Sequence, residues 1–302
     1  MMKKKLGETY SLFSYLYLLP AVALMFVFVF LPLIQSVGYS FYRIRNMKLT
    51  QFVWFENYKI LFADGIFWNS MRITIQWAFM AAIVPGFVGL ILALLLEFRT
   101  RNMVLSGITR TILFMPMMMS GVAVGLLWSL IYNPTLGIIN GLMTALGLSS
   151  NANPVNLLGD GKTALFAAFL TTVWQGSGLS MVTFSAALQG VSSDIIEAGM
   201  IDGANKFQQI RYISIPSIIG SITTVITINL ISGFKAFDIL MVLTGGGPGT
   251  STMSTSLYMY RQGFFALKFD YAAVMQVMLF ISVTIFVVIV NFLLNKVNER
   301  YT

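Results

Sequence analysis

Six long apolar segments, separated by shorter polar stretches, dominate this sequence of 302 residues. About 20 consecutive apolar residues are enough for a helix to cross the hydrocarbon core of a bilayer. Only 10% of the chain is charged, whereas a soluble domain carries roughly 25%. We therefore expect an all-α, polytopic membrane protein with six transmembrane helices. The segments cover residues 11–39, 71–96, 108–131, 164–188, 217–240 and 271–294.

The first apolar segment, residues 11–39, has two interpretations because three lysines at positions 3–5 precede it. A basic start followed by apolar residues is also typical of a cleaved secretion signal. Such a signal has an apolar core of about 7–15 residues and a small-residue cleavage site, a pattern that this longer segment does not follow. We interpret it as the first transmembrane helix, kinked at Pro20 and Pro32.

The predicted helices divide the chain into three parts. Residues 1–70 hold the N-terminal tail, the first helix and an external loop with a short amphipathic helix. Residues 71–295 form a core of five helices, and residues 296–302 form a tail. Six crossings place both termini on one side, and the slight excess of Lys and Arg there indicates the cytoplasm. Several aromatic residues of the external loop suit a membrane interface: Trp54, Phe55, Tyr58, Phe67 and Trp68.

The composition excludes several kinds of chemistry. The chain has neither Cys nor His, so disulfides, thiolate or imidazole metal sites and His-based nucleophile systems are absent. A membrane-embedded enzyme is therefore disfavoured. The net charge of +8 indicates contact with anionic lipid headgroups, and no basic stripe with interleaved aromatics indicates nucleic acid.

Residues Gly161, Lys162 and Thr163 resemble the end of a phosphate-binding loop. The motif requires another Gly where this chain has Asn156, so we expect no nucleotide, cofactor or metal in this chain. An ion-coupled secondary carrier is an alternative, but it needs carboxylates within the membrane. Only Asp238, near the end of an apolar segment, meets that need.

The stretch 192–216 mixes acids, bases and amides between two apolar segments. Asp194 followed by Glu197 predicts a helix start with a capping box. The helix has one apolar stripe, Gly203 allows another backbone to approach closely, and Pro216 begins the next helix. The stripe consists of Ile196, Met200, Ala204 and Phe207. An interfacial helix without further function is the alternative interpretation.

The order of residues in this stretch resembles the "EAA" loop of membrane subunits of ATP-binding-cassette importers. The matching pattern is E-A-G-x-x-D-G-A, then Phe207, then I-x-x-P ending at Pro216. Gly199 stands where the second Ala of the motif is usual. The resemblance implies a cytoplasmic loop that docks on an ATPase subunit, which binds the ATP and Mg. The implied coupling residues are Glu197, Ala198, Gly199, Asp202, Gly203, Ala204 and Phe207.

The sequence F-D-I-L-x-x-L-T-G-G-G-P at 237–248 is similar to the signature of sugar-uptake permeases of the maltose-transporter type. That resemblance implies a type I importer permease in the bacterial plasma (inner) membrane. The implied partners are a second homologous permease, two ATPase subunits and an extracellular solute-binding protein. It also implies an external gate of Asp238, Gly245, Gly246, Gly247 and Pro248. Alternatively, Asp238 pairs with Lys235 three residues earlier.

Two helix faces look like those that line the sugar site in this family. Amides, hydroxyls and small residues on these faces suit a carbohydrate. One face holds Thr172, Gln175, Gly176 and Leu179, and the other holds Asn229, Ser232, Gly233 and Ala236. Helix packing by small residues is the alternative interpretation. An oligosaccharide is the expected cargo, and glycerol-3-phosphate or another polyol-like solute remains open.

Overall fold

The computed structural model describes residues 12–99, 103–150 and 154–299. Within these residues the chain is mostly helical, with a single two-stranded sheet. The lysines at positions 3–5 and the end of the predicted tail, 300–302, lie outside the described residues.

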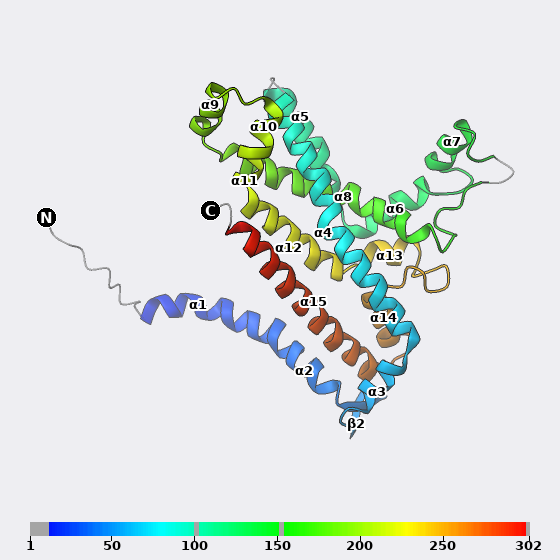
Figure 1. Ribbon diagram of the computed structural model, residues 1–302. Helices are drawn as coiled ribbons and strands as arrows, with labels where there is room; N and C mark the ends of the chain where they lie inside the picture. The colour runs from blue at the N-terminus through cyan, green and yellow to red at the C-terminus, as the bar shows by residue number, and fades with distance from the viewer. Residues whose placement is uncertain (1–11, 100–102, 151–153, 300–302) are drawn as a thin grey trace.

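Four long helices pack into the body of the molecule (Figure 1). Small residues allow close crossings, since a Cβ on Gly89 would lie 2.5 Å from the Ser180 Cβ, and one on Gly233 would lie 2.6 Å from the Ala78 Cα. The helices are α4 (Gly65–Arg99), α8 (Ala164–Gln189), α12 (Ile219–Phe234) and α15 (Phe269–Asn298). The prediction for α8 is confirmed to within one residue, whereas α4 and α15 extend beyond their predicted ends.

The first predicted span is helical throughout its described part, but it contains a π turn. It comprises α1 (Leu12–Met25), η1 (Phe26–Phe30) and α2 (Leu31–Tyr39). The irregular turn ends two residues before Pro32, which has no backbone N–H to donate to the preceding turn. The side chains of α1 and η1 whose exposure is described are all exposed, so this part of the span finds its neighbours outside this chain.

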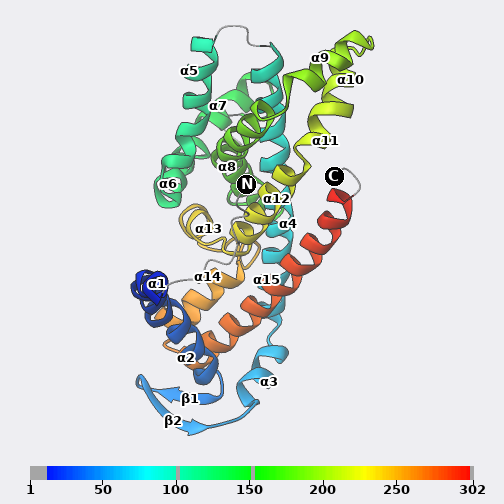
Figure 2. The same cartoon turned by 90° about the vertical axis from the view of Figure 1, so that its left-hand side faces the viewer.

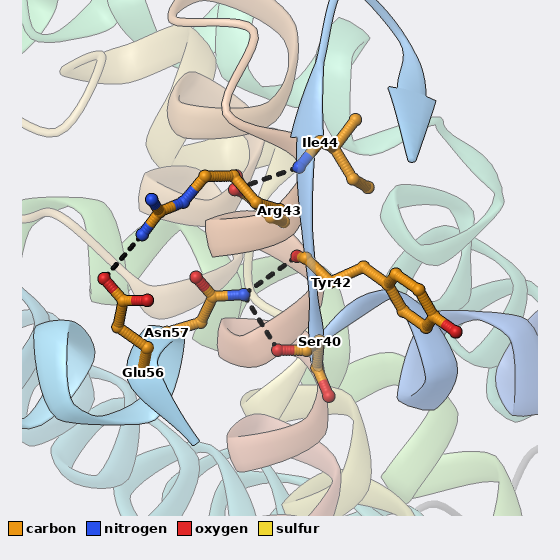
Figure 3. Close-up of polar contacts among 7 residues, drawn as sticks. Ser40, Tyr42, Arg43, Ile44, Glu56 and Asn57 are labelled. Carbon is orange, nitrogen blue, oxygen red and sulfur yellow. Dashed lines mark hydrogen bonds and ion pairs between the residues drawn. The ribbon is translucent and has the colours of Figure 1, made fainter. Parts of the chain in front are cut away.

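The loop that we predicted to be external contains a β-hairpin that we did not predict. Strands β1 (Tyr42–Arg45) and β2 (Lys48–Phe52) pair antiparallel. The predicted short helix follows as α3 (Glu56–Ala63). Figure 3 shows how α3 holds the hairpin: the Asn57 amide donates to the Ser40 and Tyr42 carbonyls at 3.0 Å each, and Arg43 pairs with Glu56 at 2.6 Å.

The predicted interfacial aromatics differ in exposure, and Tyr58 is partly buried against the core. Trp54, Phe55 and Trp68 are exposed, as an interfacial belt requires. Phe67 is fully buried, so the prediction is wrong for this residue. The reason is that α4 begins at Gly65, six residues earlier than expected, which turns Phe67 into the core.

The third predicted helix, 108–131, is wrong as a single helix. The structure has α5 (Met103–Phe114), the short 3-10 helix η2 (Met115–Met118) and α6 (Gly121–Ile131), bent by 100° at the break. Pro116 removes a backbone donor. Ser120 then starts a new helix, because its side chain accepts a hydrogen bond from the Ala123 N–H.

The fifth predicted helix, 217–240, is broken at both ends. Before it lie α10 (Lys206–Gln209), the π turn η3 (Ile210–Ser214) and α11 (Ile215–Ser217), with a 67° bend into α12. After α12, residues 235–237 are not helical, and a new helix begins as α13 (Asp238–Leu243). If each bent pair counts as one crossing, the described residues hold six candidate spans.

Three short helices complete the described fold. They are α7 (Ile138–Ala145), α9 (Ser193–Ile201) and α14 (Thr255–Tyr260), with the π turn η4 (Arg261–Phe265) after α14. The hairpin and α3 lie at one end of the molecule, and α9 and α10 lie at the opposite end (Figure 1 and Figure 2).

Candidate functional site

The stretch 192–216 begins with a helix cap at a different residue from the one we expected. Ser192 has extended backbone geometry, and its side chain accepts a hydrogen bond from the Asp194 N–H at 3.3 Å. Asp194 is therefore the second residue of α9 rather than its cap, and the predicted capping box with Glu197 is wrong. A capping box does form one helix later, between Asn205 and Gln208.

Gly203 divides the stretch into two helices. Its φ of +81° is readily adopted only by glycine. The Gly203 N–H donates to the Met200 carbonyl, and the Ala204 N–H donates to the Gly199 carbonyl, which ends α9. The predicted continuous stripe is therefore interrupted. Among the described residues of this chain nothing lies within 4 Å of a Cβ on Gly203, so no backbone of this chain makes the expected close approach there.

A close approach occurs instead at Gly199. A Cβ there would lie 2.6 Å from the Cδ1 of Ile213 in η3. The Gly of E-A-G thus lets α9 pack against the turn that leads into α12. This contact fixes the exposed helix α9 to the helix that continues into the body.

The other predicted coupling residues lie on the surface of this stretch. Glu197, Ala198 and Phe207 are exposed. Asp202, Gly203 and Ala204 line a notch of about 240 Å³, together with Gln208, Tyr212 and Ile213. The same stretch exposes five large apolar side chains: Ile195, Met200, Ile201, Phe207 and Tyr212. An exposed apolar patch with a notch is typical of a surface that binds another protein.

A cavity of about 300 Å³ opens between α4, α8, α12 and α13. It brings together all eight residues of the two predicted path faces: Thr172, Gln175, Gly176, Leu179, Asn229, Ser232, Gly233 and Ala236. Their polar groups are only partly engaged. Gln175 Nε2 donates to the Met119 carbonyl at 3.0 Å, Asn229 Nδ2 is 3.4 Å from Ser180 Oγ, and the Thr172 hydroxyl has no partner in the described structure.

The packing interpretation also holds for some of these residues, since Ala236 packs against the hydrophobic core. Gly233 lies against the α4 backbone at Ala78, so its lack of a side chain serves helix packing as well as the cavity wall. Gly176 has no such constraint, because its nearest neighbour would be the Pro85 side chain at 3.6 Å.

Several cavity residues escaped the sequence interpretation. Trp77 and Pro85 come from α4, Met117 and Gly121 come from the bend between α5 and α6, and Phe237 comes from the break before α13. Helical spacing relates residues on one helix only. A wall supplied by another segment, or by a broken helix, therefore leaves no periodic signal.

Lys235 and Asp238 form no ion pair, although both are described. The helix ends at Phe234, so the two side chains do not lie on one helical face. Both line the cavity instead. Asp238 packs against Gly121 at the start of α6, where a Cβ would lie 2.9 Å from the Asp238 Cβ.

The glycine-rich turn after α13 is held by hydroxyl groups and one cation. Gly245 and Gly246 both have positive φ. The Thr252 hydroxyl donates to the Gly247 carbonyl at 2.9 Å, and Arg261 donates to the Gly245 carbonyl. No hydrogen bond or ion pair in the described structure joins Asp238 to Gly245, Gly246, Gly247 or Pro248. The predicted gate of Asp238 and the glycine-rich turn therefore rests on no direct bond between them in the described structure, and it stays a prediction.

Solved structures share this architecture. A chain in the crystal structure of a bacterial alginate ABC transporter, in complex with an alginate pentasaccharide-bound periplasmic protein, matches with a TM-score of 0.82 and 21% identity. The match covers 94% of each chain. The fold is therefore that of a type I ABC importer permease.

The family follows from sequence. The family model described as "Binding-protein-dependent transport system inner membrane component" matches residues 86–302. A probable ABC transporter permease protein of Pyrococcus horikoshii is 33% identical over 275 residues, which cover 90% of this chain and 92% of the relative. This chain belongs to that family of inner-membrane permease subunits.

Two further relatives carry substrate names. The trehalose/maltose transport system permease protein MalF of Thermococcus litoralis is 31% identical and covers 82% of each chain. The multiple sugar-binding transport system permease protein MsmF of Streptococcus mutans is also 31% identical, covering 89% of this chain and 90% of the relative.

Proposed function

We propose that this chain is one permease subunit of an ATP-driven carbohydrate importer and forms half of the translocation path. The named sugar systems of its relatives support this cargo class. So does the cavity, whose lining includes two amides and two hydroxyls together with the partly exposed Phe237. Amides, hydroxyls and aromatic faces are the groups that suit sugar hydroxyls and ring faces.

A phosphorylated or strongly anionic cargo fits this cavity less well. Lys235 is the single cationic side chain among its lining residues, and Asp238 lines it too. A phosphate group favours several positive partners, and arginine above all. An oligosaccharide is therefore preferred over glycerol-3-phosphate.

The proposed assembly has a second homologous permease, two ABC ATPase subunits and an extracellular solute-binding protein. ATP and Mg bind to the ATPase subunits, so this chain carries no catalytic residue and no cofactor. The exposed stretch 192–216 is the observation that carries this proposal. It combines large exposed apolar side chains with a notch, and the described part of this chain does not cover them.

The stretch is also connected to the cavity. It continues through η3 and α11 into α12, which supplies Asn229, Ser232 and Gly233 to the cavity wall. A push on α9 is passed to η3 through the contact of Gly199 with Ile213. Closure of the ATPase subunits would move this arm and rock α12 between two arrangements. For the stretch to reach the ATPase subunits it must face the cytoplasm, and in the proposed orientation both termini lie on that side too.

The test replaces Glu197, which is exposed on α9. We expect Glu197→Arg to lower both carbohydrate uptake and the amount of ATPase that co-purifies with the permease, because it reverses the charge of a docking surface. Glu299→Arg is the matched control, since this acid is also exposed but lies outside the stretch. Normal uptake together with normal ATPase recovery in Glu197→Arg would reject the docking role.

A further inference from the structure

Helix α7 and the residues around it are packed with their polar groups inside. Asn140 is only 6% exposed, and its Oδ1 accepts hydrogen bonds from the Ser149 hydroxyl and the Val155 N–H, both at 3.1 Å. Ser149 also bonds to the Thr144 hydroxyl at 2.8 Å. Most of the large apolar side chains point the other way, whereas Ile139 packs against the core. The exposed ones, at 57–90%, are Leu136, Ile138, Leu142, Leu146 and Leu148. In water this arrangement is the reverse of the usual one.

The same segment carries no charge. The sequence has no Asp, Glu, Lys or Arg between Arg110 and Asp160. A surface that binds a soluble protein usually surrounds its apolar centre with a polar, solvent-accessible rim. The polar side chains beside α7 bond to one another instead, which leaves an uncharged apolar surface. Such a surface fits acyl chains and the boundary with the headgroups.

The bend between α5 and α6 limits how far α7 can stand from the membrane. The rise of α5 with η2 is about 26 Å and that of α6 is about 16 Å. At an angle of 100°, vectors of about these lengths join points about 28 Å apart. Met119 and Ser120, which lie between the two helices, add at most about 7 Å. The hydrocarbon core is about 30 Å thick. Because α7 follows α6 after a short turn, it begins near the far boundary of that core.

The position of the hydrocarbon boundary near the start of α5 further shortens the distance that α7 can reach across the membrane. Arg110 lies in the second turn of α5 and pairs with Glu97 at 3.3 Å, so charged groups still stand at this level. Less than the full length of α5 is therefore left to cross the hydrocarbon. Figure 1 shows α7 projecting sideways from the long helices rather than beyond the end where the hairpin lies.

We propose that residues 136–148 form a membrane-interface element, with their leucines inserted among the lipids of the leaflet opposite the 192–216 stretch. The partner of this surface is the lipid bilayer, and not the extracellular binding protein or the second permease. That this chain lies in a membrane follows from its family. Whether the leaflet in contact with α7 is the outer one rests on the proposed function, which places 192–216 in the cytoplasm.

The absence of cysteine from the chain allows a direct test. Leu142→Cys places one reactive thiol on the exposed face of α7, and Lys162→Cys places one at an exposed charged position later in the same loop. Each variant is labelled with an environment-sensitive fluorophore in the full transporter, whose other subunits carry no accessible cysteine. The complexes are placed in nanodiscs of phosphatidylcholine with or without doxyl-labelled lipid.

We expect doxyl lipid to quench the probe at position 142 several-fold more than the probe at 162, and aqueous iodide to show the opposite order. Iodide quenching at 142 equal to that at 162 would show a water-facing surface and overturn the proposal. Shielding from both quenchers would place a protein on α7 and would also overturn it, as would lipid quenching that disappears when the binding protein is added. Carbohydrate uptake by the same labelled complexes reports separately on the proposed function.

Discussion

The two ends of this molecule are held in different ways. At the end with the hairpin, side chains join segments that are far apart in the sequence. Asp64 accepts hydrogen bonds from the hydroxyls of Tyr258, at 2.7 Å, and Tyr271. The Thr74 hydroxyl contacts Thr255 at 3.1 Å. This end is therefore fixed by bonds between α4, α14 and α15 within the one chain.

At the opposite end, the side-chain hydrogen bonds of 192–216 are all local. Ser192 bonds to Asp194, Asn205 to Gln208, and Gln209 to the Ala204 carbonyl. These bonds shape α9 and α10, but they do not tie them to distant parts of the chain. The comparison shows that side-chain bonds between distant segments fix one end, whereas the other end has only local side-chain bonds and an exposed apolar surface, which suits the partner proposed above.

Electrostatics adds to this contrast at Asp64. Burial alone raises the pKa of this carboxyl, but the hydroxyls of Tyr271 and Tyr258 and the N–H groups of Ile66 and Phe67 outweigh it, so its pKa is lowered. Burial and the neighbouring Asp64 raise the pKa of Tyr258 to about 12. Asp64 is therefore ionised, and Tyr258 stays a hydrogen-bond donor, across the physiological range.

The largest effect is expected when the locally ordered end is distorted. Gly203→Val puts a β-branched residue at a φ of +81°, a strain of about 1–3 kcal/mol. The turn between α9 and α10 should deform, and carbohydrate uptake should fall by roughly ten-fold or more. Gly203→Asn is the control, because asparagine tolerates this geometry and should keep most of the uptake. Equal uptake in the two variants would mean that the turn has no mechanical role.

The next effect sharpens the description of the fixed end. Asp64→Asn weakens the bonds from Tyr258 and Tyr271, so we expect a loss of about 1–3 kcal/mol in the free energy of unfolding. Thermal unfolding in detergent measures it. Asp194→Asn is the matched control, since this carboxylate is exposed and belongs to the other end. A larger loss in the control would reverse the comparison.

The pH dependence of this difference has a fixed sign. Because the folded pKa of Asp64 is lowered from 3.8, the stability it provides is fully present above that pH. It is lost as the pH falls through the lower, folded-state pKa. The gap between the wild type and Asp64→Asn should therefore be constant from neutral pH down to about 5 and shrink only in stronger acid. A gap that closes between pH 5 and 7 would assign it to another group.

The smallest effect tests the cap of α9. Ser192→Ala should destabilise this helix by about 1 kcal/mol, because it removes a capping acceptor. Asp194→Ala should destabilise the helix by less than about 0.5 kcal/mol. The Asp194 side chain is not the cap, so the substitution removes only its favourable interaction with the helix dipole in the first turn. Hydrogen exchange of the α9 amides measures both. The opposite order would restore Asp194 as the cap.

The sequence was sufficient for the long straight helices and for the grouping of the cavity residues. Apolar length predicts α8 and α15, and helical spacing combines Gln175 with Thr172 on one face. The breaks between α5 and α6 and at the ends of α12 were not predictable in this way, because an apolar segment has the same composition whether its helix is straight or bent. At Met119 the open backbone carbonyl is satisfied by Gln175 from another helix, a contact that no local pattern encodes.

The β-hairpin and the turn at Gly203 were missed for different reasons. The hairpin turns at Asn46 and Met47, both with positive φ, and methionine gives no signal for such a turn. At Gly203 the small size of glycine predicts a close approach of another backbone, whereas its freedom of backbone rotation predicts a turn. The structure uses rotation at Gly203 and small size at Gly199.

The hydrogen bond from Gln175 to Met119 limits what this side chain can offer to a passing sugar. Its nitrogen carries two hydrogens, and one is already committed to the exposed carbonyl at the elbow of α5 and α6. A solute at this position therefore meets one free N–H and the amide oxygen. Shortening Gln175 would loosen the elbow and blunt recognition together, so selectivity is better dissected through Asn229 across the cavity.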